Sequence, residues 1–311
     1  MNKAHSVWQI SAGSTHRSYA DQLIDYGVAL IGPGDPGPWC TDRYDDQTVI
    51  QFATEIQVED VLLLRSGDLI KAVGIVASGY QYLPQFDDVN GMDLQHGRRV
   101  RWCRLYDPYK IDGLSAQCSK FSKIQSTCLL DYANSAINSQ LTNWKTCPLP
   151  DLPEEETSLE TYPTELQELV AQVNDLIGLY NDSKSFGKSP LESEMVAHYI
   201  IPLLRALGWP VENIALEWCN IDVCLFNKLP RTPENCYYLI EAKRVGASIE
   251  DAKEQAVGYT KSLKNHCDVV VTDGIRYRMY EASKNYDQVA YANLGRLKQS
   301  SLDLFKRLKK P

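Results

Sequence analysis

The sequence of 311 residues contains no apolar run that approaches the roughly 20 residues of a membrane span. Its first ten residues also lack the apolar stretch of a secretion signal. None of the nine cysteines forms a Cys-x-x-Cys pair and the five histidines are scattered, which argues against a zinc or iron–sulfur centre. We therefore expect a cytoplasmic protein with reduced cysteines and no membrane partner.

Positive charge is also scarce, because 32 Lys and Arg face 40 Asp and Glu, for a formal net charge of -8. Residues 1–150 carry 13 basic and 16 acidic residues, residues 151–190 carry 2 and 9, and residues 191–311 carry 17 and 15. The acidity is therefore concentrated in one short segment. The overall charge does not exclude nucleic acid as a partner of the flanking parts.

The chain length predicts about two domains. A break between them is indicated by residues 146–156, which combine three prolines with a run of glutamates and show neither helical nor strand periodicity. We interpret residues 146–163 as an acidic linker between a first domain, 1–145, and a second, 164–311. The second begins with a predicted helix over 164–180, where apolar residues recur at spacings of three and four.

The patterns predict a two-domain protein of the mixed α+β or α/β class. In the first half, runs of β-branched and apolar residues between turn-forming clusters predict a compact β-barrel with short helices, its strands including 7–10, 61–64, 70–76 and 100–105. In the second half, helices over 190–207 and 249–263 alternate with strands, which predicts an α/β core with strands at 214–219, 221–226, 237–242, 269–272 and 276–280.

Carboxylates interrupt two apolar strands of the second half. Asp222 lies in Asn-Ile-Asp-Val-Cys-Leu-Phe, and Glu241 precedes Ala242 and Lys243 at the end of the next strand. Alternation places Glu241 and Lys243 on one face, and adjacent strands would place Asp222 beside Glu241. Two carboxylates that leave room for water suit Mg²⁺, and a nearby lysine can orient a water or stabilise developing charge. The pattern predicts a magnesium site.

Two helices contribute further polar side chains. We expect Glu194 to face inward with His198 and Ile201, and Gln255 and Tyr259 lie one helical turn apart. With the run 200–209 and the segment 271–277 (Val-Thr-Asp-Gly-Ile-Arg-Tyr), these residues resemble the PD-(D/E)xK nuclease superfamily over about residues 189–285. The nuclease domain of type I restriction motor subunits is most similar, and the Gln-x-x-x-Tyr element also occurs in RecB-like nucleases.

The resemblance implies Mg²⁺-dependent hydrolysis of phosphodiester bonds, with Mn²⁺ as a substitute ion. It implies that Asp222 and Glu241 are metal ligands, with the Ala242 carbonyl as a third, and that Lys243 holds the attacking water. Glu194 would act through a metal-bound water, and Gln255 and Tyr259 would steady the lysine and the phosphate. The proline that precedes the first aspartate in the superfamily is replaced here by Ile221. Each element also has a purely structural interpretation, as a salt bridge or a surface pair.

The first half resembles the PUA-like superfamily, which includes EVE and YTH domains, in Val7-Trp-Gln-Ile, in the segment 67–80 and in the Gly- and Pro-rich loop before Trp39. This resemblance implies a small barrel that binds a nucleotide, and several members flip out a modified base and stack it on aromatic rings. The candidate pocket residues are Trp8, Trp39, Tyr80, Tyr82 and Trp102. Most could instead be core aromatics, and Trp39 is favoured because its loop is expected at the surface.

The densest basic cluster is Arg98-Arg99-Val-Arg101-Trp-Cys-Arg104. Alternation places Arg99 and Arg101 on one face of a strand, where they could follow a nucleic-acid backbone. Positive charge that guards a solvated strand edge is the alternative.

Together the two halves resemble modification-dependent restriction endonucleases, which implies a role in restriction or anti-phage defence. The expected partner is DNA with a modified base, such as a methylated or hydroxymethylated cytosine, which the first domain reads while the tethered second domain cuts. Because one metal site cuts one strand, we expect a homodimer or a transient dimer on DNA. The alternatives are a modified-nucleic-acid binding protein with a non-catalytic nuclease-like domain, and a nuclease that acts on RNA or single-stranded DNA.

Overall fold

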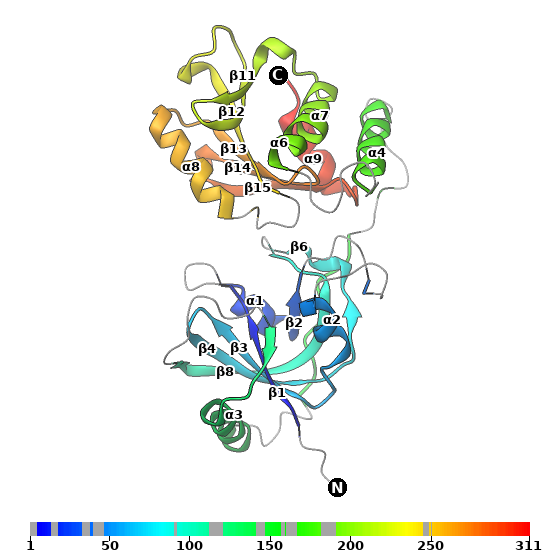
Figure 1. Ribbon diagram of the computed structural model, residues 1–311, viewed down its shortest axis with the longest axis vertical. Coiled ribbons are helices and arrows are strands. Elements are labelled where there is room, and N and C mark those ends of the chain that lie inside the picture. Colours follow the sequence, from blue (N-terminus) through cyan, green and yellow to red (C-terminus); the bar gives the residue numbers. More distant parts are fainter. Residues whose placement is uncertain are drawn as a thin grey trace. The chain divides into compact units, whose positions relative to one another are not determined.

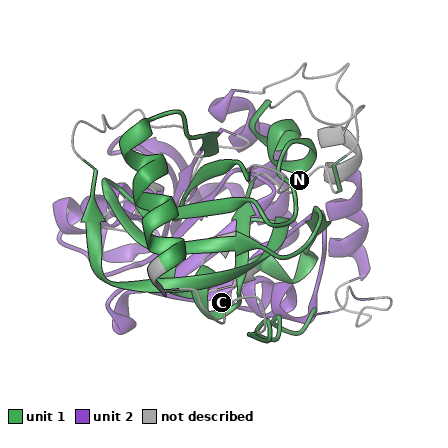
Figure 2. Ribbon diagram, turned by 90° about the horizontal axis from the view of Figure 1, so that it is seen from below, with its two compact units in different colours: residues 1–155 green, residues 156–311 purple. Residues whose placement is uncertain are grey.

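The computed structural model divides the chain into two compact units, Met1–Glu155 and Glu156–Pro311 (Figure 2). It describes residues 5–13, 18–32, 38–39, 47–89, 92–111, 121–140, 147–156, 159, 167–181, 191–244, 249 and 251–311. The division falls inside the segment 146–163 that the sequence marks as a linker, and the functions assigned to the two units stay predictions.

The first unit is built on a curled seven-stranded sheet (Figure 1). Its strands lie in the order β2-β8-β4-β3-β1-β9, and β5 pairs with the long strand β8. The elements are β1 (Val7–Ser11), α1 (Ala20–Asp25), β2 (Val28–Ile31), α2 (Gln47–Thr54), β3 (Val61–Ser66), β4 (Leu69–Val76), β5 (Gln81–Tyr82), η1 (Pro84–Phe86), β6 (Asp87–Val89), β7 (Met92–Asp93), β8 (His96–Lys110), β9 (Phe121–Lys123) and α3 (Thr127–Gln140).

Both faces of this sheet are covered, which explains why its strands have nearly continuous apolar sequences. Trp8 and Ile10 of β1 pack on one face with Phe52 of α2, whereas Val7 packs on the opposite face in the cluster beneath α3. The buried carboxylate of Asp60 accepts hydrogen bonds from the indole Nε1 of Trp8 at 2.9 Å and from two backbone N–H groups. Asp60 therefore fixes the start of the sheet.

The second unit contains a six-stranded sheet in the order β10-β11-β12-β13-β14-β15. Only β12 and β13 run parallel among these neighbours, and helix α8 connects them. The elements are α4 (Gln167–Asn181), α6 (Glu192–Met195), η3 (Val196–Ile200), α7 (Ile201–Ala206), η4 (Val211–Asn213), β10 (Ile214–Trp218), β11 (Ile221–Phe226), η5 (Pro233–Asn235), β12 (Cys236–Ala242), α8 (Asp251–Leu263), β13 (Asp268–Thr272), β14 (Arg276–Glu281), η6 (Ala282–Lys284), β15 (Asp287–Asn293) and α9 (Gln299–Leu308).

The two faces of this second sheet bury different clusters. One face packs against α4, α7 and α9, and the other packs against α8 through small residues such as Ala252 and Ala256. Pro202 lies at the first positions of α7, directly after the π-helical turn η3. A proline at this place removes a helical hydrogen bond, and the wider turn accommodates it.

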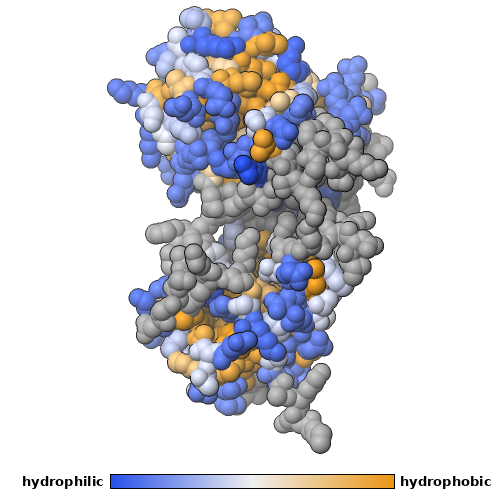
Figure 3. All heavy atoms as spheres, in the orientation of Figure 1, coloured by the Kyte–Doolittle hydropathy of each residue, from blue (hydrophilic) through white to orange (hydrophobic). Residues whose placement is uncertain are grey.

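The mixed α+β class predicted from the sequence is confirmed by these two sheets and their helices. The described residues also contain elements that the sequence analysis did not locate, among them β2, α2, α3, β9 and β15. Apolar side chains reach the surface in places (Figure 3), and the large exposed ones are Val58, Tyr106, Leu191, Val211, Leu216, Leu229 and Tyr237. Over the described part of the chain, no helix is both long and apolar enough to cross a membrane.

Candidate active site

Asp222 of β11 and Glu241 of β12 lie on the face of the second sheet that α8 covers. Strand alternation establishes this, because Cys224 and Leu239, two residues from each, belong to the cluster with α8. Lys243 follows the last residue of β12 and continues the alternation on the same face. The sheet therefore brings the two carboxylates and the ammonium to the face that α8 covers.

Hydrogen bonds join the side chains of Glu241, Lys243, Gln255 and Tyr259 in a continuous series, and Asp222 is bound to the backbone of β12. The carboxylate of Asp222 accepts from the backbone N–H of Ala242 at 2.7 Å. The Nζ of Lys243 donates to Glu241 Oε1 at 2.5 Å and to Gln255 Oε1 at 3.2 Å. The Nε2 of Gln255 in turn donates to the hydroxyl of Tyr259 at 3.0 Å. Five of the six predicted catalytic side chains are thus brought together, and their roles stay predictions.

The site carries more negative than positive charge. Burial, together with the neighbouring carboxylates, raises the pKa of Asp222 and of Glu241 above the ordinary values. Burial acts to lower the pKa of Lys243, but its hydrogen bond to Glu241 and the surrounding carboxylates outweigh burial and raise it. Lys243 is therefore held as an ammonium, and it balances only part of the negative charge around it.

Glu194 does not join this series. Its carboxylate accepts the backbone N–H of Leu191 at 2.7 Å, which satisfies an unpaired donor at the start of α6. Met195, Tyr199 and Ile200 are buried in this region, whereas His198 is exposed. The inward stripe expected for Glu194, His198 and Ile201 is therefore wrong, because the buried stripe with this four-residue spacing consists of Met195, Tyr199 and Leu203.

Glu192 is the acidic residue of α6 that acts electrostatically on the site. Its charge contributes to the pKa shifts of Asp222, Glu241 and Lys243. Glu192 was not predicted as a site residue from the sequence. Adjacent helical residues differ by about 100° around the helix axis, so a stripe displaced by one position presents different side chains to the core.

The donor set suits a hard divalent cation. Two carboxylates on one face, a third carboxylate nearby and a single ammonium leave negative charge that a cation would neutralise. Within the described ranges, no group of three or more His, Cys, Asp or Glu side chains is close enough to hold a metal ion alone. Mg²⁺ commonly uses one or two carboxylates and completes its shell with water and substrate oxygens, so the two carboxylates fit it.

Two of the five predicted pocket aromatics in the first unit are structural. Trp8 is 1% exposed, stacks on Phe121 with ring centroids 5.1 Å apart and donates to Asp60, so its assignment to a base pocket is wrong. Trp102 donates to the carbonyl of Val28 at 2.9 Å, and its ring lies so close to Gly74 that a Cβ there would be 2.4 Å from Cε3. Its ring is used in packing against the sheet backbone.

The other three aromatics gather around a buried histidine. The hydroxyl of Tyr80 accepts the backbone N–H of Trp39 at 2.8 Å and is 2.8 Å from Nδ1 of His96. The rings of Tyr80 and Tyr82 lie 5.9 and 5.8 Å from the His96 ring. Trp39, Tyr80 and Tyr82 are half-buried, whereas His96 is fully buried and was not predicted from the sequence. We call these four residues the His96 cluster.

The arginines of the basic cluster bind the protein itself. Arg98 is 2% exposed and donates to the carbonyls of Phe52 and Ala53 at the end of α2, and burial lowers its pKa to about 10. Arg104 pairs with two aspartates of α1. Arg99 donates to the carbonyls of Gly27 and Pro150, and Arg101 donates to that of Cys147 at 3.0 Å.

Part of the predicted linker therefore lies along β8. Residues 147–155 have no regular secondary structure, and Leu152 packs against the core of the first unit. The predicted contact of Arg99 and Arg101 with a nucleic-acid backbone stays a prediction, and it would compete with these two contacts.

Residues 8–124 match a family model described as a domain of unknown function, DUF8426. No curated protein matches the chain at a significant level. Among solved structures, the chain is similar to one described as a fragment of an HsdR subunit of a type I restriction enzyme from Vibrio vulnificus, with 16% sequence identity and a TM-score of 0.28. That match covers 39% of this chain and 26% of the other. A similarity of this size does not establish a common fold, so the function proposed below rests on the contacts of the site.

Proposed function

We propose that the second unit is a Mg²⁺-dependent nuclease that hydrolyses phosphodiester bonds in DNA. The observation that supports it most strongly is the series Asp222, Glu241, Lys243, Gln255 and Tyr259, in which an ammonium is held between a buried carboxylate and an amide. A salt bridge formed for stability alone would not need a second, uncompensated carboxylate on the same face. Excess negative charge beside a fixed cation is an arrangement suited to a metal and a phosphate.

Each side chain of the site would have its own chemical role. Asp222 and Glu241, with the Ala242 carbonyl, would hold the ion, and bound Mg²⁺ supplies Lewis acidity at the scissile phosphate. The Nζ of Lys243 is fixed by Glu241 Oε1 and Gln255 Oε1, so its third proton can orient a water or stabilise charge on a phosphate oxygen. Tyr259 fixes the orientation of the Gln255 amide. Mn²⁺ would substitute for Mg²⁺.

For the first unit we propose a role as the reader of a modified base. The His96 cluster combines half-buried aromatic rings with a hydroxyl–imidazole pair, which provides stacking surface and polar groups at one place. Within the described residues, the indole Nε1 of Trp39 is buried without a hydrogen-bond acceptor. A base seated against Trp39 could accept that hydrogen bond. Joined to the nuclease, such a reader defines a modification-dependent endonuclease of a restriction or anti-phage system.

The test uses the purified full chain and duplex DNAs that differ only in cytosine or adenine modification. We expect Mg²⁺- or Mn²⁺-dependent cleavage of a modified duplex, abolished by a chelator and by Glu241→Gln. The matched control is Lys284→Met, which removes an exposed cation from another carboxylate, Glu281, and should cleave like wild type. Binding of modified DNA without any cleavage would instead support a non-catalytic binding protein.

Two further outcomes refine the proposal. Faster cleavage of matched RNA or single-stranded DNA than of duplex DNA would mean that the nuclease acts on RNA or on single-stranded DNA. Because one site of this kind cuts one strand, we also propose a dimer that forms at least on DNA. Sedimentation with a modified duplex should show two protein chains per duplex, and a single chain that cuts both strands would contradict the dimer.

A further inference from the structure

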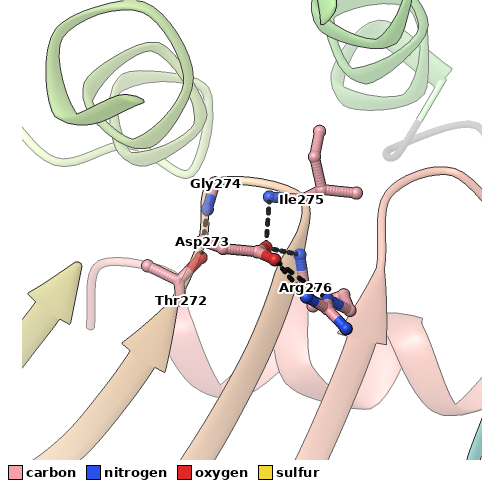
Figure 4. A network of polar contacts seen from close by, with 5 residues as sticks. All are labelled: Thr272, Asp273, Gly274, Ile275 and Arg276. Carbon is pink, nitrogen blue, oxygen red and sulfur yellow. Dashed lines mark hydrogen bonds and ion pairs between the residues drawn. The ribbon is translucent and has the colours of Figure 1, made fainter. Parts of the chain in front are cut away.

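The turn between β13 and β14 is held by a buried ion pair (Figure 4). Asp273 is 1% exposed, and one of its carboxylate oxygens accepts the backbone N–H groups of Ile275 and Arg276. The other oxygen accepts from Nε and a terminal nitrogen of Arg276, at 3.0 and 2.6 Å. The hydroxyl of Thr272 accepts the N–H of Gly274 at 2.8 Å. With four bonds on one carboxylate, the shape of the turn is fixed.

One side of this turn supports the backbone of Lys243. Strand β13 runs parallel to β12 with Ala242 opposite Thr272. The carbonyl of Thr272, one residue before Asp273, accepts the backbone N–H of Lys243 at 2.8 Å. The position of the Lys243 backbone therefore depends on where the turn leaves β13.

The tip of the turn contacts the helical segment that carries Glu192. Gly274 has a φ of +87°, and a Cβ at this position would be 2.4 Å from Met195 Cε and 3.3 Å from Tyr199 Cβ. Met195 ends α6 and Tyr199 lies in η3, and both side chains are fully buried. The positive φ favours glycine, and a side chain here would also have to displace the end of Met195. The turn thus lies between the two parts of the acidic site.

From these contacts we infer that Asp273 and Arg276 are positioning residues for the cation site, which set the place of α6 with Glu192 relative to Lys243. This inference rests on the proposed nuclease function. It adds that Asp273 and Arg276 hold in place the helix that carries the third carboxylate, Glu192. Neither residue touches the ion or the substrate. Each acts through the turn, in the way that outer hydrogen bonds orient the ligands of other metal sites.

The test measures binding of Mn²⁺ to the full chain by electron paramagnetic resonance, without any nucleic acid. Asp273→Asn keeps an acceptor oxygen for the turn but loses the ion pair, and we expect Mn²⁺ affinity to fall by about tenfold, as for other outer-shell changes. The matched control is Asp268→Asn at the opposite end of β13, where the carboxylate accepts the backbone N–H of Ala282 at 2.8 Å. Its Mn²⁺ affinity should equal that of wild type.

A second pair of variants covers the case in which Asp273→Asn does not fold. Gly274→Ala should weaken Mn²⁺ binding, because its Cβ displaces the end of Met195 and the positive φ strains the turn. Gly274→Ala combined with Met195→Ala should recover the part of that loss that the clash causes. A turn needed only for folding would show no such recovery in Mn²⁺ affinity.

The outcomes separate the two proposals. Wild-type Mn²⁺ affinity in Asp273→Asn and Gly274→Ala, or an equal loss in Asp268→Asn, would overturn the positioning role while leaving the nuclease proposal intact. Absence of Mn²⁺ binding to the wild-type protein would overturn the nuclease proposal, and the positioning role with it.

Discussion

Replacing Lys243 by methionine should destabilise the protein more than removal of any surface lysine. The Nζ of Lys243 lies 2.5 Å from Glu241 Oε1, and the Glu241 side chain is 3% exposed. Removing one partner of a buried pair costs about 3–5 kcal/mol, because the other charge is left without compensation. Since the Lys243 side chain is 22% exposed, water reaches part of the pair. We therefore expect a loss of about 2–3 kcal/mol in the free energy of unfolding.

The control is the same substitution at Lys284, whose Nζ lies 3.2 Å from Glu281 with a side chain that is 55% exposed. Exposed pairs contribute about 0–1 kcal/mol, so Lys284→Met should lie near wild type. Urea titrations of both variants without divalent ions give the two values. Adding Glu241→Gln to Lys243→Met should recover part of the loss, because the buried charge is then removed.

The cost of Lys243→Met should also depend on pH. Burial raises the pKa of Glu241, and the hydrogen bond and charge of Lys243 oppose that rise. Without Lys243 the pKa of Glu241 rises further, so the ionised carboxylate destabilises the folded state above that pKa, and protonation relieves the cost as the pH falls below it. Equal costs for Lys243→Met and Lys284→Met, or a cost that grows on acidification, would refute this reasoning.

Three further predictions concern other described residues. Burial raises the pKa of Asp222, so the metal-free protein should lose stability as the pH rises through that pKa. Asp222→Asn should remove this loss and raise Tm at neutral pH, and a lower Tm measured by calorimetry would contradict the prediction. Asp60→Ala leaves the Trp8 indole and two backbone donors without their acceptor, and it should lower the free energy of unfolding by about 2–4 kcal/mol. A loss below about 1 kcal/mol in a urea titration would mean that water replaces the carboxylate. Tyr80→Phe removes the hydroxyl between Trp39 and His96 and should weaken binding of a modified duplex about tenfold, as measured by fluorescence anisotropy. Tyr109→Phe is the control and should bind like wild type; equal losses in the two variants would show that the His96 cluster does not read the base.

The sequence predicted the second unit in considerable detail because its signals are local. Strand alternation placed Glu241 and Lys243 on one face, and the four-residue spacing placed Gln255 beside Tyr259, as the structure has them. The face of the helix that carries Glu194 was misjudged, because Met195, Tyr199 and Leu203 form its buried stripe. The sequence predicted one helix over 190–207, whereas α6 begins at Glu192 and a π-helical turn follows it.

In the first unit, local sequence patterns did not predict which side chains contact one another. Apart from Trp39, which its loop favoured, the sequence did not distinguish the candidate aromatic residues, and long-range contacts do. Trp8 is buried by Phe121 and Asp60, whereas Tyr80 is placed beside His96 by the pairing of β5 with β8. The arginines of β8 likewise meet partners as far away as residues 147 and 150, a contact that no spacing rule indicates.

The most direct test of the nuclease proposal is single-turnover cleavage of one duplex, with and without its modified base, by wild type and Asp222→Asn at saturating protein and Mg²⁺. The proposal predicts cleavage of the modified duplex by wild type only, with the Asp222→Asn protein still binding that duplex with wild-type affinity. Intact DNA in every reaction, with both Mg²⁺ and Mn²⁺, or equal cleavage by Asp222→Asn, would contradict it.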